Sequence, residues 1–186
     1  MEARAFFNSD IKKSICDELN KSTKNIYAAV AWFNDIEIFE ILKEKVKNNV
    51  DLNLIIANDE VNSTLPFNEI SDLGGKIFKL VKDNALLHHK FCVIDEHTLI
   101  TGSYNWTYAA NSKNLENIIV LENNIKLNQT YIQCFNNILD EEFKYIEDTI
   151  NILGNMQEEI ENLKKNIIKY KEVPIQVIYG IEKIKS

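Results

Sequence analysis

Residues 86–107 read LLHHKFCVIDEHTLITGSYNWT, and the rest of the chain is best interpreted from this stretch. It holds two short runs rich in apolar and β-forming residues, His89–Ile94 and Thr98–Tyr104, with the polar residues Asp95–His97 between them. This pattern predicts two antiparallel strands joined by a tight turn. We expect this β-hairpin to carry the functional site.

Polar side chains are expected to gather on one face of the hairpin. With a two-residue loop, Lys90 lies opposite Ser103 and His88 lies opposite Asn105. Because side chains alternate between the faces of a strand, these four project from one side and His89 from the other. Such a patch suits a phosphate diester: the imidazole can attack phosphorus, the ammonium can neutralise the phosphate oxygens, and the hydroxyl and amide can donate hydrogen bonds to them.

The spacing of these residues resembles the signature of the phospholipase D superfamily, HxKxxxxD followed by GSxN. The matching residues are His88, Lys90, Asp95, Gly102, Ser103 and Asn105. Trp106 and Thr107 continue the motif as they often do in this family, and residues 114–117 (NLEN) look like the NxEN that commonly follows it. The order of strands and helices between about residues 25 and 122 also resembles this family.

The resemblance implies metal-independent chemistry in which His88 attacks phosphorus and becomes phosphorylated. In the family, the carboxylate of the NxEN stretch holds the proton on the imidazole nitrogen that does not attack phosphorus. The resemblance assigns this role to Glu116. Asp95 lies at the turn, so we expect it to brace the hairpin or a dimer interface. The candidate catalytic set is His88, Lys90, Ser103, Asn105 and Glu116, with Asp95 as the brace.

The same resemblance implies a homodimer formed through the catalytic domain. Family members with one motif pair two subunits, so that the second His88 can act as the general acid. No cofactor or metal is expected, because His88, His89 and His97 belong to no HExxH or Cys/His cluster. His89 and His97 are interpreted as bystanders.

Outside the hairpin, apolar periodicity predicts an α/β fold. Strands are expected at about 25–33, 50–57, 76–81 and 117–121, and helices at about 9–20, 34–48, 66–73 and 124–143. Strand, helix, strand units are normally parallel. We therefore expect a mixed, mostly parallel β-sheet flanked by helices on both faces, as a catalytic domain over residues 1–143.

Residues 144–186 are predicted to form a helical C-terminal extension. Apolar residues from Ile146 to Ile167 are spaced by three and four, with Gln157 and Lys164 at two positions of the seam. Two alternatives stay open: a long amphipathic helix that lies on the domain, or a coiled-coil or partner-binding helix. Ile175–Ile181, after Pro174, could form a further strand.

Composition limits the classes of function. The chain has 186 residues and a net charge of −7, which is unfavourable for a nucleic-acid enzyme unless a local positive groove exists. No apolar run is long enough to span a membrane, and the N-terminus has no signal-peptide layout, so we expect a cytoplasmic protein. The chain has three cysteines, Cys16, Cys92 and Cys134. Because their number is odd, we interpret them as reduced and buried thiols.

The leading hypothesis is a phosphodiester hydrolase, a nuclease that hydrolyses DNA or RNA through a phosphohistidine intermediate, with DNA the more expected substrate. One alternative is a phospholipid headgroup hydrolase or transferase, which would require an exposed apolar rim around the site. Another is a non-catalytic adaptor that binds phosphates through the motif and a partner protein through the C-terminal helix. Trp32 and Phe33 are interpreted either as core or dimer interface, or as part of a substrate wall.

Overall fold

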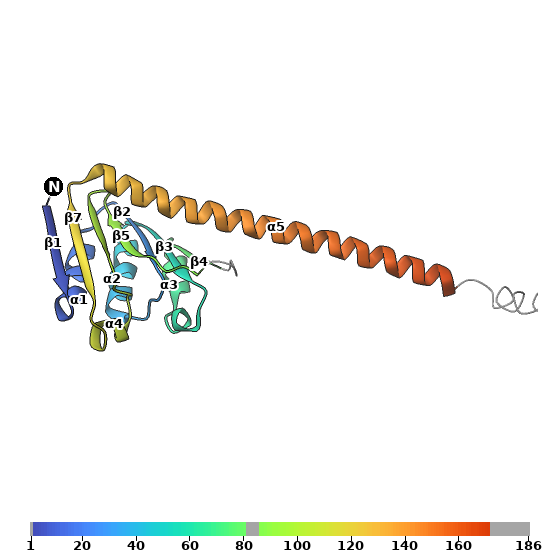
Figure 1. Ribbon diagram of the computed structural model, residues 1–186, viewed down its shortest axis with the longest axis horizontal. Helices are drawn as coiled ribbons and strands as arrows, with labels where there is room; N and C mark the ends of the chain where they lie inside the picture. Colours follow the sequence, from blue (N-terminus) through green and yellow to red (C-terminus); the bar gives the residue numbers. More distant parts are fainter. Residues whose placement is uncertain (1, 81–85, 172–186) are drawn as a thin grey trace, which may run out of the picture. The chain divides into compact units, whose positions relative to one another are not determined.

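A computed structural model describes the backbone of residues 2–80 and 86–171, and side chains as far as residue 165. The chain divides into two compact units, Met1–Glu142 and Phe143–Ser186, which are described separately. The first unit holds the hairpin and the sheet around it (Figure 1).

The described residues include one seven-stranded sheet with the order β1-β7-β6-β5-β2-β3-β4. The strands are β1 (Glu2–Phe7), β2 (Asn25–Val30), β3 (Asp51–Ala57), β4 (Lys76–Leu80), β5 (Lys90–Ile94), β6 (Thr98–Gly102) and β7 (Asn117–Glu122). Neighbours β2, β3 and β4 pair in parallel, whereas the other four pairings are antiparallel. The α/β class and the mixed sheet are confirmed, but the expectation of a mostly parallel sheet is wrong.

The reason for the difference lies in the connections between strands. A parallel pair needs a crossover, and α2 and α3 supply one each in the β2 to β4 half. In the other half, a tight turn joins β5 to β6 and favours an antiparallel pair, and the connection of residues 103–116 with α4 returns the chain to pair β7 antiparallel to β6. The helices are α1 (Ser9–Lys21), α2 (Ile36–Lys47), α3 (Phe67–Asp72), α4 (Tyr108–Ser112) and α5 (Ile125–Lys171), with a 3₁₀ helix η1 (Glu60–Ser63).

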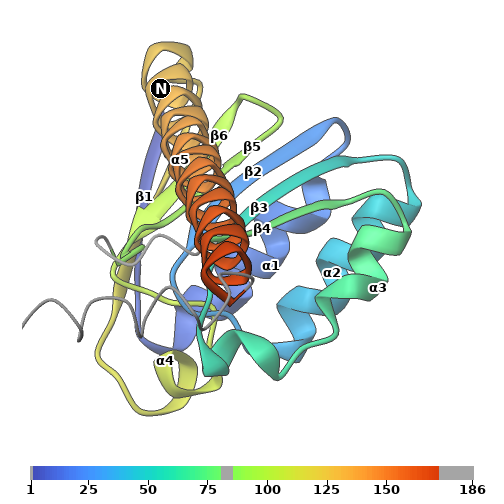
Figure 2. The same cartoon turned by 90° about the vertical axis from the view of Figure 1, so that its right-hand side faces the viewer.

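Helices cover both faces of the sheet, as predicted. Figure 2 shows α1, α2 and α3 on one side, where Ile15, Leu42 and Ile70 join a large apolar core with alternate residues of the strands. On the other side, the start of α5 places Phe135 in a second cluster with Phe91 and other residues of the sheet. The sheet is buried between these two layers, which accounts for the continuous apolar run in β2.

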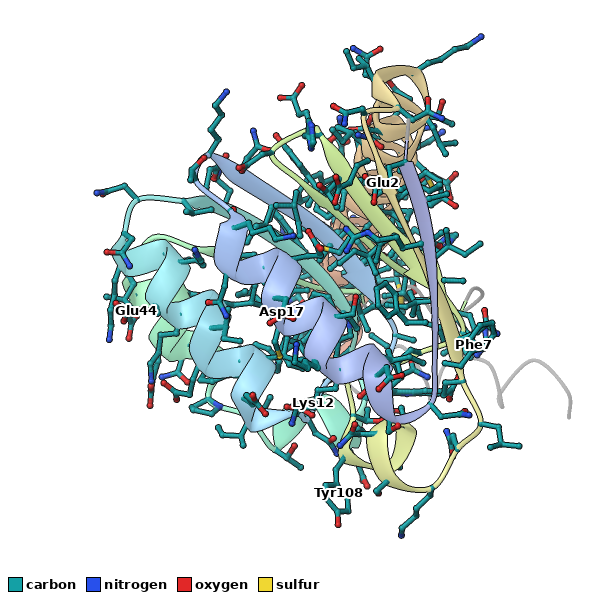
Figure 3. All side chains as sticks on the ribbon, turned by 90° about the vertical axis from the view of Figure 1, so that its left-hand side faces the viewer. Glu2, Phe7, Lys12, Asp17, Glu44 and Tyr108 are labelled. Atoms are coloured by element: carbon teal, nitrogen blue, oxygen red, sulfur yellow. The ribbon has the colours of Figure 1, made fainter. Side chains whose placement is uncertain are left out.

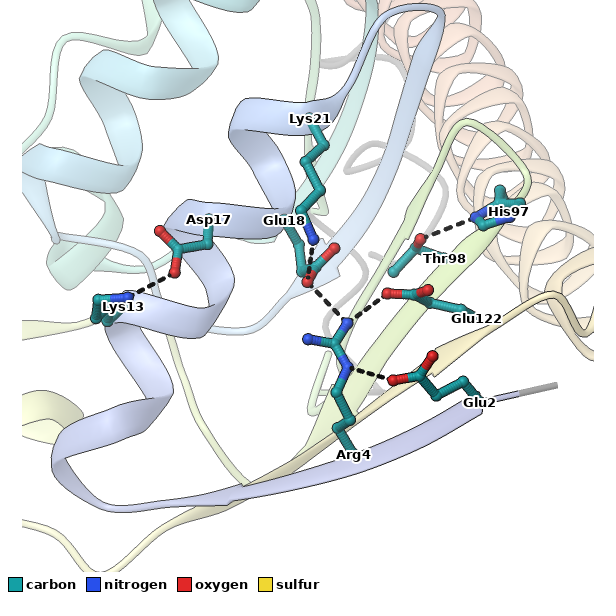
Figure 4. A network of polar contacts seen from close by, with 9 residues as sticks. All are labelled: Glu2, Arg4, Lys13, Asp17, Glu18, Lys21, His97, Thr98 and Glu122. Atoms are coloured by element: carbon teal, nitrogen blue, oxygen red, sulfur yellow. Dashed lines mark hydrogen bonds and ion pairs between the residues drawn. The ribbon is translucent and has the colours of Figure 1, made fainter.

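Strand β1 was not predicted, because EARAFF is short and carries charge. It forms the edge of the sheet and pairs with β7 along its whole length. An ion-pair network anchors it, as Figure 4 shows: the Arg4 guanidinium donates to Glu18 of α1 at 2.9 Å and also bonds Glu122 of β7. The Glu18 carboxylate is only 3% exposed and also accepts from Lys21. A single arginine therefore joins β1 to both a helix and the neighbouring strand.

Replacing Arg4 by methionine is expected to lower the free energy of unfolding by about 1–3 kcal/mol, because the buried Glu18 carboxylate loses one of its two cationic partners. Chemical denaturation monitored by circular dichroism measures this. Lys13→Met is the matched control, since the Lys13–Asp17 pair on the same helix is exposed and its loss should leave stability unchanged. Equal effects of the two substitutions would contradict the anchoring role of Arg4.

Helix α5 continues from the first unit into the second, so no break separates the predicted helix at 124–143 from the extension. Within the second unit, Phe143, Ile146, Ile150, Leu153 and Ile160 are all exposed. The predicted strand at Ile175–Ile181 lies outside the described residues. Among the residues that the structure describes, no helical segment has the length and apolar character that a membrane crossing requires.

Candidate functional site

The predicted site residues lie on segments that meet where several strands begin or end. This edge of the sheet runs across the strands, unlike the edge strand β1. The register aligns the end of β2 with the start of β5 (Val30 with Lys90) and the end of β6 with the start of β7 (Gly102 with Ile118). Phe7 ends β1 at the same edge, opposite Asn117. Figure 3 shows Phe7 and Tyr108 at this end of the sheet, and Glu2 at the other.

The hairpin register differs from the prediction by one residue. Ile94 pairs with Thr98 and Phe91 pairs with Thr101, so the connection has three residues rather than two. Asp95 and Glu96 both adopt positive φ angles, and the N–H of His97 donates to the Ile94 carbonyl at 2.9 Å. In this register, Lys90 does not face Ser103 across the ladder. The alternation of side chains along the two strands is therefore not enough to bring the site residues together.

Lys90 and His88 meet instead around a residue from another strand connection, Trp32. The Lys90 ammonium donates to the His88 carbonyl at 2.8 Å and lies 5.8 Å from the centre of the Trp32 ring. The His88 and Trp32 rings are 5.8 Å apart at an interplanar angle of 83°. His88 is exposed and Trp32 is half-buried. The imidazole is thus open to solvent and contacts the same aromatic ring as the Lys90 ammonium.

Asn105 joins this cluster through the backbone of the same connection. Its side-chain oxygen accepts from the Trp32 N–H at 3.4 Å, which leaves the amide NH₂ to donate elsewhere. The carbonyl of Trp106 accepts from the N–H groups of Asn34 and Asp35. These bonds tie the GSxN segment, which follows the end of β6, to the segment between β2 and α2.

Ser103 and Glu116 form the second part of the site. The Ser103 hydroxyl donates to the Glu116 carboxylate and accepts from the N–H of Asn117 at 3.1 Å. The side-chain amide of Asn114 donates to the other Glu116 oxygen at 2.9 Å. Asn8, at the end of β1, holds the Glu116 backbone by accepting from its N–H and donating to its carbonyl, both at 3.2 Å. Glu116 is therefore held by Ser103 after β6, by Asn8 after β1 and by Asn114 of its own loop.

Asn8 also lies at the start of α1. Ser9 is the first residue of this helix, and Asn8 takes the cap position without a side-chain capping bond. The Asn8 side chain bonds Glu116 instead. The helix start thus gives up a capping bond while the loop that carries Glu116 gains an anchor.

Electrostatics connects the two parts of the site. Burial of the Lys90 ammonium lowers its pKa, and the nearby Glu116 carboxylate acts in the opposite direction. Within the described residues, the side-chain hydrogen bonds recorded for Glu116 lead to Ser103 and Asn114, and none leads to His88. The orientation of His88 by Glu116 therefore stays a prediction.

Asp95 lies at the opposite end of β5, about 17 Å along the strand from Lys90. Its carboxylate accepts from the N–H groups of Thr23, Lys24 and Asn25 at 2.8–3.0 Å and from the hydroxyl of Thr23 at 3.0 Å. Partial burial acts to raise the pKa of Asp95, but the backbone N–H groups outweigh it and hold the pKa below the ordinary value. The motif aspartate thus ties the hairpin turn to the start of β2.

Replacing Asp95 by asparagine is expected to reduce stability at neutral pH by about 1–2 kcal/mol, because a charged acceptor of several N–H groups is lost. A carboxylate whose pKa is lowered in the folded state stabilises the fold at pH values above its ordinary pKa of 3.8. This contribution disappears as the pH falls through the lowered pKa of the folded state. The stability difference between wild type and variant should therefore shrink between about pH 5 and pH 2. Urea unfolding at several pH values measures it, and a difference that stays constant over this range would contradict the assignment.

The other histidines have different surroundings. The His89 ring contacts the Phe91 ring at 5.7 Å, and burial lowers the pKa of His89. His97 lies in the turn and its ring bonds the Thr98 hydroxyl at 3.3 Å. Over residues 2–80 and 86–171, no group of three His, Cys, Asp or Glu side chains is placed so that it could hold a metal ion.

Two residues that organise this edge carried little signal in the sequence. Trp32 contacts both His88 and Lys90, although a tryptophan at the end of an apolar run is typical of a core. Asn62 lies in η1, within a polar stretch of sequence, yet it is fully buried: its oxygen accepts from the Phe33 N–H and its NH₂ donates to the carbonyls of Ala31 and Ala57. No local pattern distinguishes this asparagine from those on the surface.

Comparison with known proteins identifies the family of this chain. The family model described as "Cardiolipin synthase, PLD-like domain" matches residues 15–139. The chain belongs to the phospholipase D superfamily. This phospholipase D-like chain is 28% identical over 127 residues to the "Phospholipase D" of Rickettsia bellii, an alignment that covers 67% of this chain and 62% of that protein.

Two further similarities define the range of relatives. The "Mitochondrial cardiolipin hydrolase" of Chlamydomonas reinhardtii is 29% identical over 124 residues, which cover 67% of this chain and 55% of that protein. The crystal structure of Nuc from Salmonella typhimurium, a phospholipase D family member, superimposes with a TM-score of 0.63 at 23% identity, over 73% of this chain and 93% of that one. This phospholipase D-like chain thus spans about three-fifths of its curated relatives and nearly all of the fold of Nuc.

Proposed function

We propose that this phospholipase D-like chain is a metal-independent phosphodiesterase whose nucleophile is His88. The observation that carries the proposal is that the exposed His88 imidazole and the Lys90 ammonium both contact the Trp32 ring, whose backbone N–H donates to Asn105. A phosphate placed there would meet a nucleophile, a cation and an amide donor, which are the groups that phosphoryl transfer needs. Ser103 and Glu116 complete the motif at the neighbouring strand ends.

The reaction proceeds in two steps. A ring nitrogen of His88 bonds to phosphorus, and the bond from phosphorus to the leaving oxygen breaks. A second imidazole, which is protonated at this stage, gives its proton to that oxygen. The second imidazole then takes a proton from water, whose oxygen attacks phosphorus and releases His88 and a phosphomonoester. Lys90 neutralises the non-bridging oxygens in both steps.

The second imidazole comes from the His88 of a second subunit, because each chain carries the motif once. A homodimer through the catalytic domain requires this edge of the sheet to face its copy. Large apolar side chains surround the edge and form what we call the apolar rim: Phe7, Ile36, Leu86, Tyr108 and Leu115, each 58–90% exposed. A second copy of the chain would cover these side chains and bring the two imidazoles together.

The dimer is tested with one substitution in the rim and one away from it. Leu115→Asp places a charge in the proposed interface, so we expect a monomer in sedimentation velocity and at least a tenfold loss of turnover. Ile125→Asp is the matched control, because Ile125 is equally apolar and 67% exposed but begins α5 at the other end of the sheet. A wild-type protein that is fully active as a monomer would exclude the shared site.

Nucleic acid is the substrate that we propose, with DNA preferred to RNA. A half-buried tryptophan beside a lysine is typical of sites that follow a single strand through stacking and charge. A phospholipid is the second candidate, because the apolar rim is the feature that a lipid hydrolase would need at a membrane surface. Two curated relatives carry the names phospholipase D and cardiolipin hydrolase.

Cleavage of labelled single-stranded DNA, duplex DNA, RNA and cardiolipin vesicles, each in excess EDTA, separates these substrates. We expect turnover of nucleic acid, with DNA cleaved faster than RNA. Turnover of vesicles alone would replace the nuclease by the lipid hydrolase, and no turnover of any substrate by a folded dimer would favour the phosphate-binding adaptor. The buried thiols of Cys16 and Cys92 agree with the reducing cytoplasm that we propose as its location.

A partner protein on the C-terminal helix is a separate proposal, supported by the exposed apolar residues of the second unit. Ile150→Glu together with Leu153→Glu in the full chain should abolish recruitment of a partner without changing cleavage. An adaptor would lose its function through this double substitution, whereas an independent phosphodiesterase would keep it.

A further inference from the structure

Trp32 contacts the two groups on which the proposed chemistry depends most. The Lys90 ammonium lies over its ring, and the His88 imidazole meets it edge-on. Lys90 in turn donates to the backbone carbonyl of His88. The indole is therefore the side chain that both the ammonium and the imidazole contact, and it carries no charge of its own.

We propose that Trp32 is a positioning residue of this site, which holds the Lys90 ammonium and the His88 imidazole in place for attack on phosphorus; this proposal rests on the proposed phosphodiesterase function. The indole attracts the ammonium through its ring face and restricts the imidazole by contact. Lysine has a flexible four-carbon chain, so an ammonium without such a restraint would sample positions away from the phosphate.

Trp32 can do this because its own backbone is held rigidly. Its N–H donates to Asn105, and its two chain neighbours are bonded to the buried amide of Asn62. The Ala31 N–H also donates to the His89 carbonyl at 2.9 Å, which locks the connection to the strand that follows His88. The indole is therefore fixed relative to the segment whose side chains it contacts.

The geometry also explains how Lys90 can serve a phosphate from this position. One of its three N–H groups is used by the His88 carbonyl, and the others are free to donate to non-bridging oxygens. Burial lowers the pKa of Lys90, and the nearby Glu116 carboxylate acts in the opposite direction, in favour of the charged ammonium. A cation held in place before the reaction stabilises the charge on the phosphate oxygens in the transition state without a cost of reorganisation.

The test compares Trp32→Leu with Trp32→Phe in the full chain. Leucine removes the ring, and we expect kcat to fall about tenfold with KM changed less than threefold, as a cation–π contact and a ring contact are lost. Phenylalanine restores a ring, so it should recover kcat to within about threefold of the wild type. Turnover of Trp32→Leu within twofold of the wild type, or equal losses in both variants, would overturn the proposal.

A second readout does not depend on turnover. In protein labelled with ¹³C-histidine, Trp32→Leu should shift the ring resonances of His88 and leave those of His97, at the far end of the hairpin, unchanged. Unshifted His88 resonances would overturn the contact and the positioning role with it. An inactive wild-type protein would instead overturn the proposed function, so the two failures are distinguishable.

Discussion

Replacing His88 by glutamine is expected to lower phosphodiester hydrolysis at least 10⁴-fold, the scale on which loss of a covalent nucleophile reduces kcat. Glutamine can keep a hydrogen bond but cannot form the bond to phosphorus. The side chain is exposed, so the fold should be unaffected. Cleavage rates in excess EDTA, with circular dichroism on the same samples, measure both effects.

His89→Gln is the matched control, because His89 is the neighbouring residue and its ring contacts Phe91 rather than Trp32. We expect this variant to retain turnover within about threefold. Substantial cleavage by His88→Gln, or a loss of similar size in His89→Gln, would remove His88 from the role of nucleophile.

Replacing Gly102 by alanine is expected to cost about 3 kcal/mol or more of stability and most of the activity. A Cβ at this position would lie 2.2 Å from the carbonyl oxygen of Asn117 and 2.7 Å from the Cα of Ile118, and both are backbone atoms of β7 that cannot move aside cheaply. The glycine of the GSxN motif thus permits close approach of β6 and β7. Thermal unfolding and turnover of Gly102→Ala check this together.

Gly154→Ala serves as its control. Gly154 lies in α5 and a Cβ there would meet nothing within 4 Å, so alanine should leave the catalytic unit unchanged and favour the helix by roughly 1 kcal/mol. If Gly102→Ala were as stable and active as Gly154→Ala, the close packing of β6 on β7 would not be the reason for glycine in the motif.

Most of the fold could be predicted because its elements follow their local patterns. Helix α2 begins after Asp35, whose side chain accepts from Glu37 and Ile38 as an N-cap should, and the apolar stripe with Phe39 faces the core. Strand β1 escaped prediction because its stability depends on Arg4 and on pairing with β7, and both are long-range contacts.

The residues of the site were predictable from the motif, whereas the register of the hairpin was not. The motif identified His88, Lys90, Ser103, Asn105 and Glu116, and the structure places all of them at one edge of the sheet. The predicted register was wrong by one residue, since the turn depends on bonds from Thr23, Lys24 and Asn25 to Asp95 that no local pattern reveals.

The contacts of Trp32 and Asn62 were hidden for the same reason. Each acts on residues that are distant in the sequence, so their roles follow only from the way the connections after β2 and β3 pack at the sheet edge.

The central claim is covalent catalysis by His88, and rapid alkaline quenching of a single turnover followed by mass spectrometry tests it most directly. The wild-type protein, mixed in EDTA with the substrate that it cleaves, should carry the phosphoryl group of that substrate on the peptide that contains His88, and His88→Gln should carry none. An adduct on a different residue, or turnover without any adduct at a time resolution shorter than the turnover, would contradict the account.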